Sequence, residues 1–390
     1  MKVVIAPDSF KESLDAQQVA FAIERGLKSI DPSLKTLCVP VADGGEGTTE
    51  ALVAATRGEL KCNRVSGPLG EPLEAIWGVL GEQANTPLTA VVETASASGL
   101  DKLSSAQRDA LRATTFGTGE LILAALDQGV RRIILGLGGS ATNDGGTGLL
   151  SALGARFLDA QGNSLAPGGA ALAELDSIDL TQLDPRLAET EFLVACDVDN
   201  PLLGERGASA IFGPQKGATP EQVEQLDAAL ANLADVSTRL LGKDMRDVEG
   251  AGAAGGLGYA LVQFLNARMA PGIDLVLEAV QFNDLIEGAA LVITGEGRID
   301  GQSLSGKTPV GVARWAKRQN LPVIALCGSI GDGAEGVHGV GIDALFSVVP
   351  GVCTLDQALV HAAVNLERTA AQIARTINLT GAFHQRSGKG

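Results

Sequence analysis

Apolar and polar positions follow two different periods along this chain, and the change from one to the other marks the predicted elements. Residues 3–6 form a short, wholly apolar run of the kind that makes a buried parallel strand. From Ala16 to Ile30, apolar residues recur on one helical face, and Asp15 before them is the predicted N-cap. A strand over 36–41 and a helix over 48–56 repeat this unit. Two strand–helix steps of this length predict a parallel, doubly wound sheet.

The pattern changes over residues 59–100, where turn signals separate short strand-like runs, and we interpret the change as the start of a second domain. The elements predicted from there on are strands over 75–80 and 89–93, a helix over 119–128, strands over 133–137 and 192–195, and a helix over 220–241. The plain strand–helix pattern returns near residue 289. It predicts strands over 290–293, 323–327 and 344–348, a helix over 309–319, and a final helix over 355–377 that Thr354 and Gln357 cap.

The expected fold class is therefore α/β, with two domains. Residues 1–62 and 288–380 should form a discontinuous, Rossmann-like domain with a doubly wound parallel sheet. Residues 63–287 should form a second α/β domain inserted into the first, and residues 381–390 a flexible tail. A cleft between the two domains is the expected place for a ligand.

The loop that follows the strand over 133–137 carries the strongest chemical signal. It runs to Gly148 and consists of glycines, hydroxyl residues and an Asn-Asp pair. Glycines let successive backbone N–H groups converge on one anion, most often a phosphate, and Asp144 beside them suggests Mg²⁺ or a reacting hydroxyl. Glycine loops also close ordinary turns, but similar loops occupy 42–48 and 294–301. Three such loops, each after a strand, predict strand ends that converge on a polyanion.

Other loops carry charged residues that suit the same chemistry. After the first strand, Lys11 can neutralise a phosphate, while Asp8 can hold a metal or accept a proton. Asp43 and Glu46 allow the same two roles, and Lys216 stands between glycines in a loop suited to an anion. A solvated turn with a capping acid is the alternative explanation of each acidic loop.

Asp197 and Asp199 follow the strand over 192–195 and would lie on the same side of an extended backbone. Paired carboxylates in this place suggest a Mg²⁺ site or a general base. Their spacing resembles the start of an EF-hand loop, but the sixth position is Leu202 rather than glycine, so a calcium loop is excluded.

Residues 301–308 match the Walker A expression letter for letter. That motif requires the strand to run straight into the first glycine, whereas seven residues separate Ile293, the end of the predicted strand, from Gly301. We therefore do not predict a P-loop here. Lys307, at a helix entrance, remains a candidate phosphate ligand whatever the loop conformation.

Composition limits the classes of function. The net charge of −16 argues against a nucleic-acid or anionic-membrane partner, since both require a basic face. The five cysteines form no CxxC motif, which argues against a zinc site or a disulfide framework. No run of 18 apolar residues occurs, and the apolar run at the N-terminus is too short for a signal peptide. A reduced, cytoplasmic protein is expected.

Seven motifs, in order, resemble the bacterial glycerate kinase family, of the type that yields 2-phosphoglycerate. The resemblance covers Met1 to about Asn378. It implies a two-domain α/β fold with the second domain inserted into the first, and it implies ATP and Mg²⁺ as cofactors. The motifs are Asp8-Ser-Phe-Lys-Glu-Ser, Ala42-Asp-Gly-Gly-Glu-Gly-Thr, Gly138-Gly-Ser-Ala-Thr-Asn-Asp-Gly-Gly, Cys196-Asp-Val-Asp-Asn-Pro-Leu, Gly213-Pro-Gln-Lys-Gly-Ala, Gly252-Ala-Ala-Gly-Gly and Thr294-Gly-Glu-Gly-Arg-Ile-Asp-Gly-Gln.

Under this resemblance, each loop residue receives an expected role in phosphoryl transfer, which needs positioning, cations and a base. The expected catalytic residues are Asp197, Asp199, Lys11 and Asp43, with Asp144 and Asp197 as metal ligands. The expected cofactor-binding residues are Gly138, Gly139, Ser140, Asn143, Asp144, Gly295, Glu296 and Lys307. The expected substrate-binding residues are Asp8, Ser9, Arg298 and Lys216, among which Arg298 could hold the carboxylate of glycerate bidentately.

The expected function is ATP-dependent phosphorylation of D-glycerate at the C2 hydroxyl by a monomer or homodimer, and transfer to C3 is the alternative. A nicotinamide-dependent dehydrogenase would need G-x-G-x-x-G after the first strand, where Pro7-Asp-Ser-Phe-Lys-Glu stands instead. A non-catalytic sugar-acid sensor would not need so many carboxylates in its loops.

Overall fold

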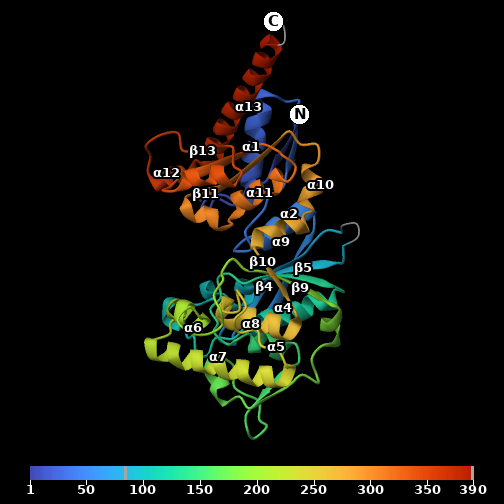
Figure 1. The fold of residues 1–390 in the computed structure, drawn as a ribbon, viewed down its shortest axis with the longest axis vertical. Helices are drawn as coiled ribbons and strands as arrows, with labels where there is room; N and C mark the ends of the chain where they lie inside the picture. Colours follow the sequence, from blue (N-terminus) through green and yellow to red (C-terminus); the bar gives the residue numbers. More distant parts are fainter. Residues whose placement is uncertain (83–85, 388–390) are drawn as a thin grey trace. The chain divides into compact units, whose positions relative to one another are not determined.

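The chain folds into two compact units, which we describe separately. The structure is a computed structural model and describes residues 1–82 and 86–387. Unit 1 consists of Met1–Asp43 and Val276–Gly390, and unit 2 of Gly44–Leu275 (Figure 1). The expected boundaries lay at residues 62 and 288. The first boundary lies earlier because helix α2 (Thr48–Thr56) packs on the sheet of unit 2, where a Cβ at Gly78 would lie 2.4 Å from Cγ2 of Val53.

Unit 1 is built on a five-stranded sheet in which all strands are parallel. Its spatial order is β13 (Ala344–Ser347), β12 (Val323–Ile330), β11 (Leu291–Ile299), β1 (Lys2–Ile5) and β2 (Lys35–Cys38). From β1 the chain steps outward to β2, whereas from β11 it steps the opposite way to β12 and β13. This confirms the predicted doubly wound α/β class. It also creates a topological switch point between β1 and β11, where such sheets bind ligands at the carboxyl ends of their strands.

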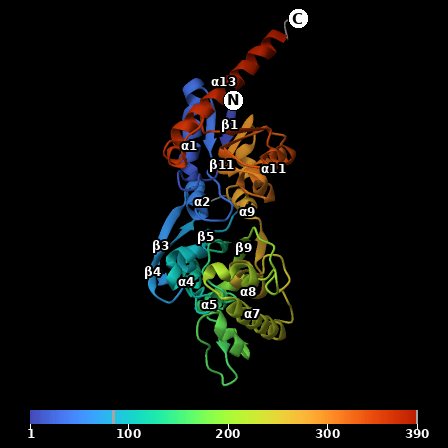
Figure 2. The same ribbon diagram turned by 90° about the vertical axis from the view of Figure 1, so that its left-hand side faces the viewer.

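Helices cover both faces of this sheet. Figure 2 shows α1 (Ala16–Ile30) and α13 (Ala362–Ser387) on one side and α11 (Thr308–Lys317) on the other. Helix α1 has the predicted bounds, since Asp15 caps it and a continuous apolar face is buried against the sheet. The remaining elements of unit 1 are α10 (Phe282–Ile286), α12 (Leu355–Val360), and the 3₁₀ helices η6 (Gly301–Ser305) and η7 (Ala334–Val340). Helix α9 (Gly272–Ala279) contains the point in the sequence at which unit 2 ends and unit 1 resumes.

Helices α1 and α13 approach each other closely at Gly26. A Cβ at this position would lie 2.2 Å from the carbonyl oxygen of Glu367. We expect Gly26→Ala to lower the free energy of unfolding by about 1–3 kcal/mol, because the two helices must move apart. Gly339→Ala, with no atom within 4 Å of its new methyl, is the control and should stay near wild type in chemical denaturation. Equal midpoints for both variants would contradict this packing argument.

The C-terminal segment differs from its prediction in two ways. The capping box of Thr354 and Gln357 is present, as predicted, but α12 ends at Val360 and a new helix begins at Ala362. Helix α13 then continues to Ser387, so residues 381–387, expected in a flexible tail, are helical. Residues 388–390 of that expected tail lie outside the described residues.

Strand β11 is longer than predicted and includes most of the predicted glycine loop 294–301. It runs to Ile299, and Gly295 pairs with Leu326 of β12. A Cβ at Gly295 would lie 2.2 Å from the carbonyl oxygen of Leu326, so this glycine permits close strand approach rather than an anion-binding turn. Only Asp300 then separates the strand from Gly301, which corrects the seven-residue gap assumed above. The segment after it is the 3₁₀ helix η6, capped by Asp300.

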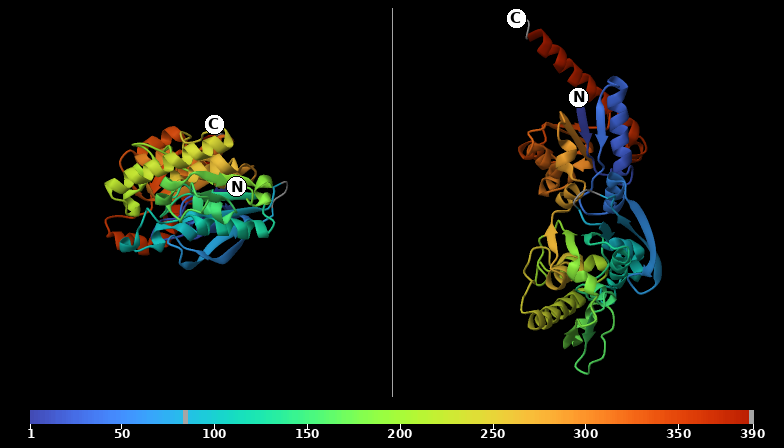
Figure 3. Two further views of the ribbon diagram at one scale, coloured as in Figure 1. Left: turned by 90° about the horizontal axis from the view of Figure 1, so that it is seen from below. Right: turned by 90° about the vertical axis from the view of Figure 1, so that its right-hand side faces the viewer.

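Unit 2 contains a mixed six-stranded sheet. Its spatial order is β10 (Arg268–Ala270), β9 (Glu191–Ala195), β6 (Arg132–Gly136), β5 (Thr89–Glu93), β4 (Pro72–Val79) and β3 (Glu59–Ser66). Strands β5, β6, β9 and β10 are parallel to one another, whereas β3 and β4 form an antiparallel hairpin. Strand β4 also pairs antiparallel with β5. The spatial order follows the chain order, so this sheet has no switch point. The small pair β7 (Arg156–Leu158) and β8 (Ser177–Asp179) projects at one end of the unit (Figure 3).

Both faces of the unit 2 sheet are covered. Trp77 and Gly78 are neighbours on β4 and point to opposite faces. Gly78 faces α2, and Trp77 lies in the main apolar core with residues of α4 (Phe116–Asp127). Helix α7 has the predicted bounds. The helices of this unit, besides α2 and α4, are α3 (Thr94–Ser98), α5 (Thr147–Ala152), α6 (Ala208–Phe212), α7 (Pro220–Leu241) and α8 (Ala253–Leu265).

Among the described residues, no helix combines the length and the apolar character needed to cross a bilayer.

Candidate active site

Asp8 lies at the switch point of unit 1, directly after β1. Its backbone N–H donates to the carbonyl oxygen of Gly295 at 2.8 Å, which extends the pairing of β1 with β11. Its carboxylate accepts hydrogen bonds from Oγ1 of Thr308 at 2.5 Å and from the N–H of Ser9 at 2.6 Å. Strand order therefore places Asp8 beside the first residue of α11, although 300 positions separate the two residues in sequence.

Glu296 lies on β11 at the same switch point. The residue is only 8% exposed, and its carboxylate accepts a hydrogen bond from the buried Oγ of Ser303 at 2.5 Å. The ammonium of Lys307 lies 4.0 Å from the other carboxylate oxygen. Lys307 is the N-cap residue of α11, so the start of this helix contributes both a cation and a helix dipole to the site.

Burial raises the pKa values of both carboxyl groups. The pKa of Asp8 rises to about 6 because the group is desolvated; the hydrogen bond from Thr308 opposes the shift, and the charge of Asp43 adds to it. The pKa of Glu296 rises to about 7, again because of burial, with Ser303 and Lys307 opposing the shift and Asp8 and Asp43 adding to it. The three carboxylates thus repel one another, and the cluster favours a proton or a cation near neutral pH.

The raised pKa of Glu296, caused mainly by burial, predicts an unusual pH dependence of stability. The folded protein holds a proton on Glu296 up to about pH 7, whereas the unfolded chain loses it near the ordinary value of 4.5. Between these values the folded state binds more protons, so the free energy of unfolding should fall as pH rises, by on the order of 3 kcal/mol from this group. Thermal unfolding in EDTA checks the slope, which Glu296→Gln should flatten. A slope unchanged by that substitution would contradict the assignment.

Two expected site residues of unit 1 are exposed. The guanidinium of Arg298 forms an ion pair with Asp300, with Nε 2.9 Å from Oδ2, and its side chain is 66% exposed. Lys11 is exposed in the loop after β1, whose backbone passes over Gly297 of β11. Both side chains are accessible to a ligand. Gly295, expected to bind the cofactor, instead uses its carbonyl oxygen to accept from Asp8.

In unit 2, two of the predicted glycine loops lie side by side at the carboxyl ends of the strands. Gly138 and Gly139 are exposed in a turn after β6, where Gly139 has φ +71°. A Cβ at Gly138 would lie 3.7 Å from Cα of Gly45, in the neighbouring loop. Ser140 is buried and forms a bridge with Gly99. The structure therefore brings these two loops together in one unit, while the segment 294–301 belongs to unit 1.

Asp144, expected as a metal and nucleotide ligand, is wholly buried. Its carboxylate accepts hydrogen bonds from the N–H and Oγ1 of Thr115 at 2.8 and 2.9 Å, and from the N–H groups of Gly146 and Gly148 at 3.1 and 3.2 Å. These donors lie at the starts of α4 and α5. Burial raises the pKa of Asp144, and the bonds from Thr115, Gly146 and Gly148 lower it. With its oxygens occupied, Asp144 is an internal cap.

Lys216, expected to bind substrate, and Asn143, expected to bind the cofactor, are also buried in unit 2. Lys216 is 1% exposed, and its ammonium donates to the carbonyl oxygen of Thr142 at 2.6 Å. Burial lowers the pKa of Lys216 to about 7, and the charge of Asp144 opposes that shift. Asn143 donates from Nδ2 to Oγ of Ser209 at 3.0 Å. Neither side chain reaches the surface.

Asp197 and Asp199 have different surroundings. Oδ1 of Asp197 accepts a hydrogen bond from the N–H of Gly272, at the start of α9, at 3.0 Å. Asp199 forms an ion pair with Arg206 at 2.8 Å, in which both side chains are about two-thirds exposed. An exposed pair of this kind is typical of a solvated surface. Within the described ranges, no group of three or more His, Cys, Asp or Glu side chains is arranged to hold a metal ion.

Sequence reasoning missed three residues that complete these networks. Ser303 and Thr308 orient Glu296 and Asp8 through their hydroxyl groups. Glu93, the last residue of β5, is a partly buried carboxylate that accepts from the N–H of Thr49 at 2.7 Å. Burial raises its pKa, and the hydrogen bond from Thr49 opposes the shift. Glu93 had a sequence signal as an acid at the end of an apolar strand, and Thr308 had one as the hydroxyl residue of the Walker A match.

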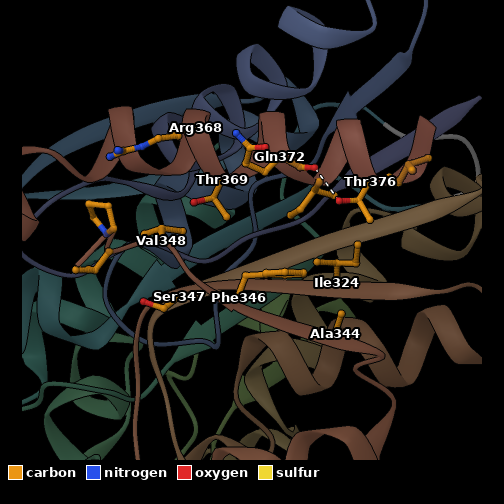
Figure 4. A pocket seen from close by; sticks show the side chains of 13 residues that line it. Ile324, Ala344, Phe346, Ser347, Val348, Arg368, Thr369, Gln372 and Thr376 are labelled. Atoms are coloured by element: carbon orange, nitrogen blue, oxygen red, sulfur yellow. Dashed lines mark hydrogen bonds between the residues drawn. The ribbon is translucent and has the colours of Figure 1, made fainter. Parts of the chain in front are cut away.

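A cavity of about 470 Å³ lies elsewhere in unit 1, between α13 and the strands β12 and β13. Figure 4 shows Gln372 and Thr376 above Ile324 and Phe346, so its wall is apolar on the sheet side. It contains no carboxylate and is lined by none of the residues of the switch point. We assign it no part in the chemistry.

Comparisons with known proteins show the family to which this chain belongs. The glycerate kinase family matches residues 3–378 of this chain. The chain is similar to "Glycerate kinase" of Bacillus subtilis (strain 168), with 54% identity over 379 residues that cover 97% of this chain and 98% of the relative. It is 51% identical over 377 residues to "Glycerate 2-kinase" of Escherichia coli (strain K12), covering 97% and 98%. The chain is also similar to the protein in "Crystal structure of putative glycerate kinase 2 from Salmonella typhimurium LT2", with a TM-score of 0.90 and 51% identity, covering 98% of this chain and 99% of that chain.

Proposed function

Because this chain belongs to the glycerate kinase family and is an enzyme, we propose that it transfers the γ-phosphoryl group of ATP to the C2 hydroxyl of D-glycerate. The products would be 2-phosphoglycerate and ADP. The observation that carries the proposal is the pair Asp8 and Glu296 at the switch point of unit 1, two buried carboxylates held by hydroxyl donors. Similarity to the Escherichia coli protein named glycerate 2-kinase favours C2 over C3.

The proton of the reacting hydroxyl requires an acceptor, and we assign this role to Glu296. Its carboxylate is oriented by Ser303 and protected from solvent, while Lys307 nearby stabilises its charged form. Brønsted behaviour favours a base whose proton affinity is near that of the working pH. The exposed Lys11 and Arg298 are suited to the anionic groups, with Arg298 on the glycerate carboxylate.

The residues of unit 1 also fit Mg²⁺. Asp8 and Asp43 supply hard carboxylate oxygens and repel each other, and a cation would relieve that repulsion. Mg²⁺ commonly takes only one or two protein carboxylates and completes its shell with water and phosphate oxygens, so a larger acidic cluster is not required. When bound, the ion would neutralise charge on the phosphates. Thr308 would keep the carboxylate of Asp8 in place.

For the phosphate chain of ATP we assign the turn Gly138–Ser140 in unit 2. Its two glycines are exposed and follow a buried strand, so their N–H groups can approach an anion without a Cβ in the way. Asp144 and Lys216, which the sequence suggested as direct ligands, are buried in the same unit.

An activity assay tests the proposal. Purified protein should consume ATP only when D-glycerate and Mg²⁺ are both present, and phosphorus NMR should identify 2-phosphoglycerate as the product. Formation of 3-phosphoglycerate would place the attack at C3. Binding of glycerate without ATP consumption under any condition would favour the sensor alternative and overturn the proposal.

A further inference from the structure

Lys216 is a buried cation that none of the assigned chemistry uses. It ends the short 3₁₀ helix Pro214–Lys216 and is 1% exposed. Its ammonium donates to the carbonyl oxygen of Thr142 at 2.6 Å. Thr142 lies two residues after the turn Gly138–Ser140. The hydrogen bond from Lys216 therefore holds the backbone directly after this turn.

The backbone on either side of Thr142 is held by other contacts. Asp144 joins it to the starts of α4 and α5, and the N–H of Ala141 donates to the carbonyl oxygen of Ser98 at 2.9 Å. A Cβ at Gly255 would lie 2.0 Å from the carbonyl oxygen of Thr142, so a glycine leaves room for it. Among the described residues, the Thr142 hydroxyl itself has no hydrogen-bond partner. The carbonyl of Thr142 is therefore fixed by Lys216 from one side and fitted against Gly255 on another.

A role in stability alone does not account for a lysine here. Desolvating an ammonium group costs several kcal/mol, and apolar side chains of similar volume often replace buried charges without loss of stability. Methionine would fill the same space without that cost. Compared with methionine, lysine adds a hydrogen bond to one carbonyl oxygen. This bond is directional, so it restricts the conformation of the backbone.

We propose that Lys216 is a positioning residue that fixes the conformation of the turn Gly138–Ser140 by holding the Thr142 carbonyl oxygen. It touches neither nucleotide nor glycerate. The inference rests on the proposed function, because it assumes that this turn binds the phosphates of ATP.

The substitution Lys216→Met tests the inference. The Kd for ATP, measured by calorimetry, and the KM for ATP should both rise at least about tenfold, while the KM for glycerate changes less than about twofold. The denaturation midpoint should stay near that of the wild type. Lys216→Gln, which keeps a donor on a shorter chain, should fall between Met and the wild type.

Lys243→Met is the matched control. Lys243 lies in the same unit and donates to the carbonyl oxygen of Val262 at 3.3 Å and to Oδ1 of Asn266 at 2.6 Å, away from the turn. It should leave both constants for ATP unchanged. Unaltered ATP binding in a folded Lys216→Met protein would overturn the inference. Failure of both Lys216 variants to fold would also overturn it, because the lysine would then be structural. If the wild type itself does not phosphorylate glycerate, the proposed function fails instead, and the calorimetric comparison still decides the role of Lys216.

Discussion

Replacing Glu296 by Gln is expected to lower kcat at least about a hundredfold, with little change in the KM for ATP. Glutamine keeps the size of the side chain and can still accept the hydrogen bond from Ser303, but it cannot take the proton of the acceptor hydroxyl. Steady-state kinetics at saturating ATP, Mg²⁺ and D-glycerate measure the effect. The folded protein should be at least as stable as wild type at pH 8, since the substitution removes a buried charge.

The control for this experiment is Glu367→Gln. Glu367 lies on α13 in the same unit and forms an exposed ion pair with Arg25, whose loss should cost less than about 1 kcal/mol and leave kcat unchanged. A Glu296→Gln enzyme with kcat within threefold of wild type would show that another group accepts the proton. A variant that is both slow and strongly destabilised would point to a structural role for Glu296.

The largest loss of stability is expected from Asp144→Ala. This change removes the acceptor shared by Thr115, Gly146 and Gly148 and leaves their buried N–H groups without it. It also removes the negative charge that favours the charged form of the buried Lys216 ammonium. Breaking such a network typically costs about 3–5 kcal/mol, a large part of the total stability of a domain. Chemical denaturation should therefore show a clear fall in the unfolding midpoint, or the variant should fail to accumulate as folded protein.

Asp199→Ala provides the comparison within the same unit. It removes an aspartate whose partner Arg206 is exposed, so the midpoint should change little. If Asp144→Ala were as stable as Asp199→Ala, the carboxylate of Asp144 would not be the internal cap that its hydrogen bonds indicate.

Periodicity and capping signals were sufficient to predict the regular elements of this chain. Helices α1 and α7 have their predicted bounds because each combines an N-cap signal with a continuous apolar face. Strand β11 was underestimated because Gly295 and Gly297 resemble a loop. In the structure, Gly295 allows β12 to approach closely, and this requirement depends on a neighbour that the local sequence does not specify.

The sequence named candidate residues of the proposed site but not their arrangement in space. Asp8, Glu296 and Lys307 were each identified from local patterns, but only the strand order of unit 1 places them at one switch point. For Asp144, the sequence did not predict the surroundings of the side chain. An aspartate among glycines and threonines fits a metal loop and an internal cap equally well, and burial, which the sequence does not reveal, decides between them.

The position of the divalent ion tests the central claim most directly. Crystals grown with Mn²⁺ and a non-hydrolysable ATP analogue would locate it by anomalous scattering. We predict a peak within coordination distance of the Asp8 or Asp43 carboxylate, and no peak at Asp144. A peak at Asp197 or Asp144, with none beside Asp8 or Asp43, would contradict the assignment of the metal to the switch point of unit 1.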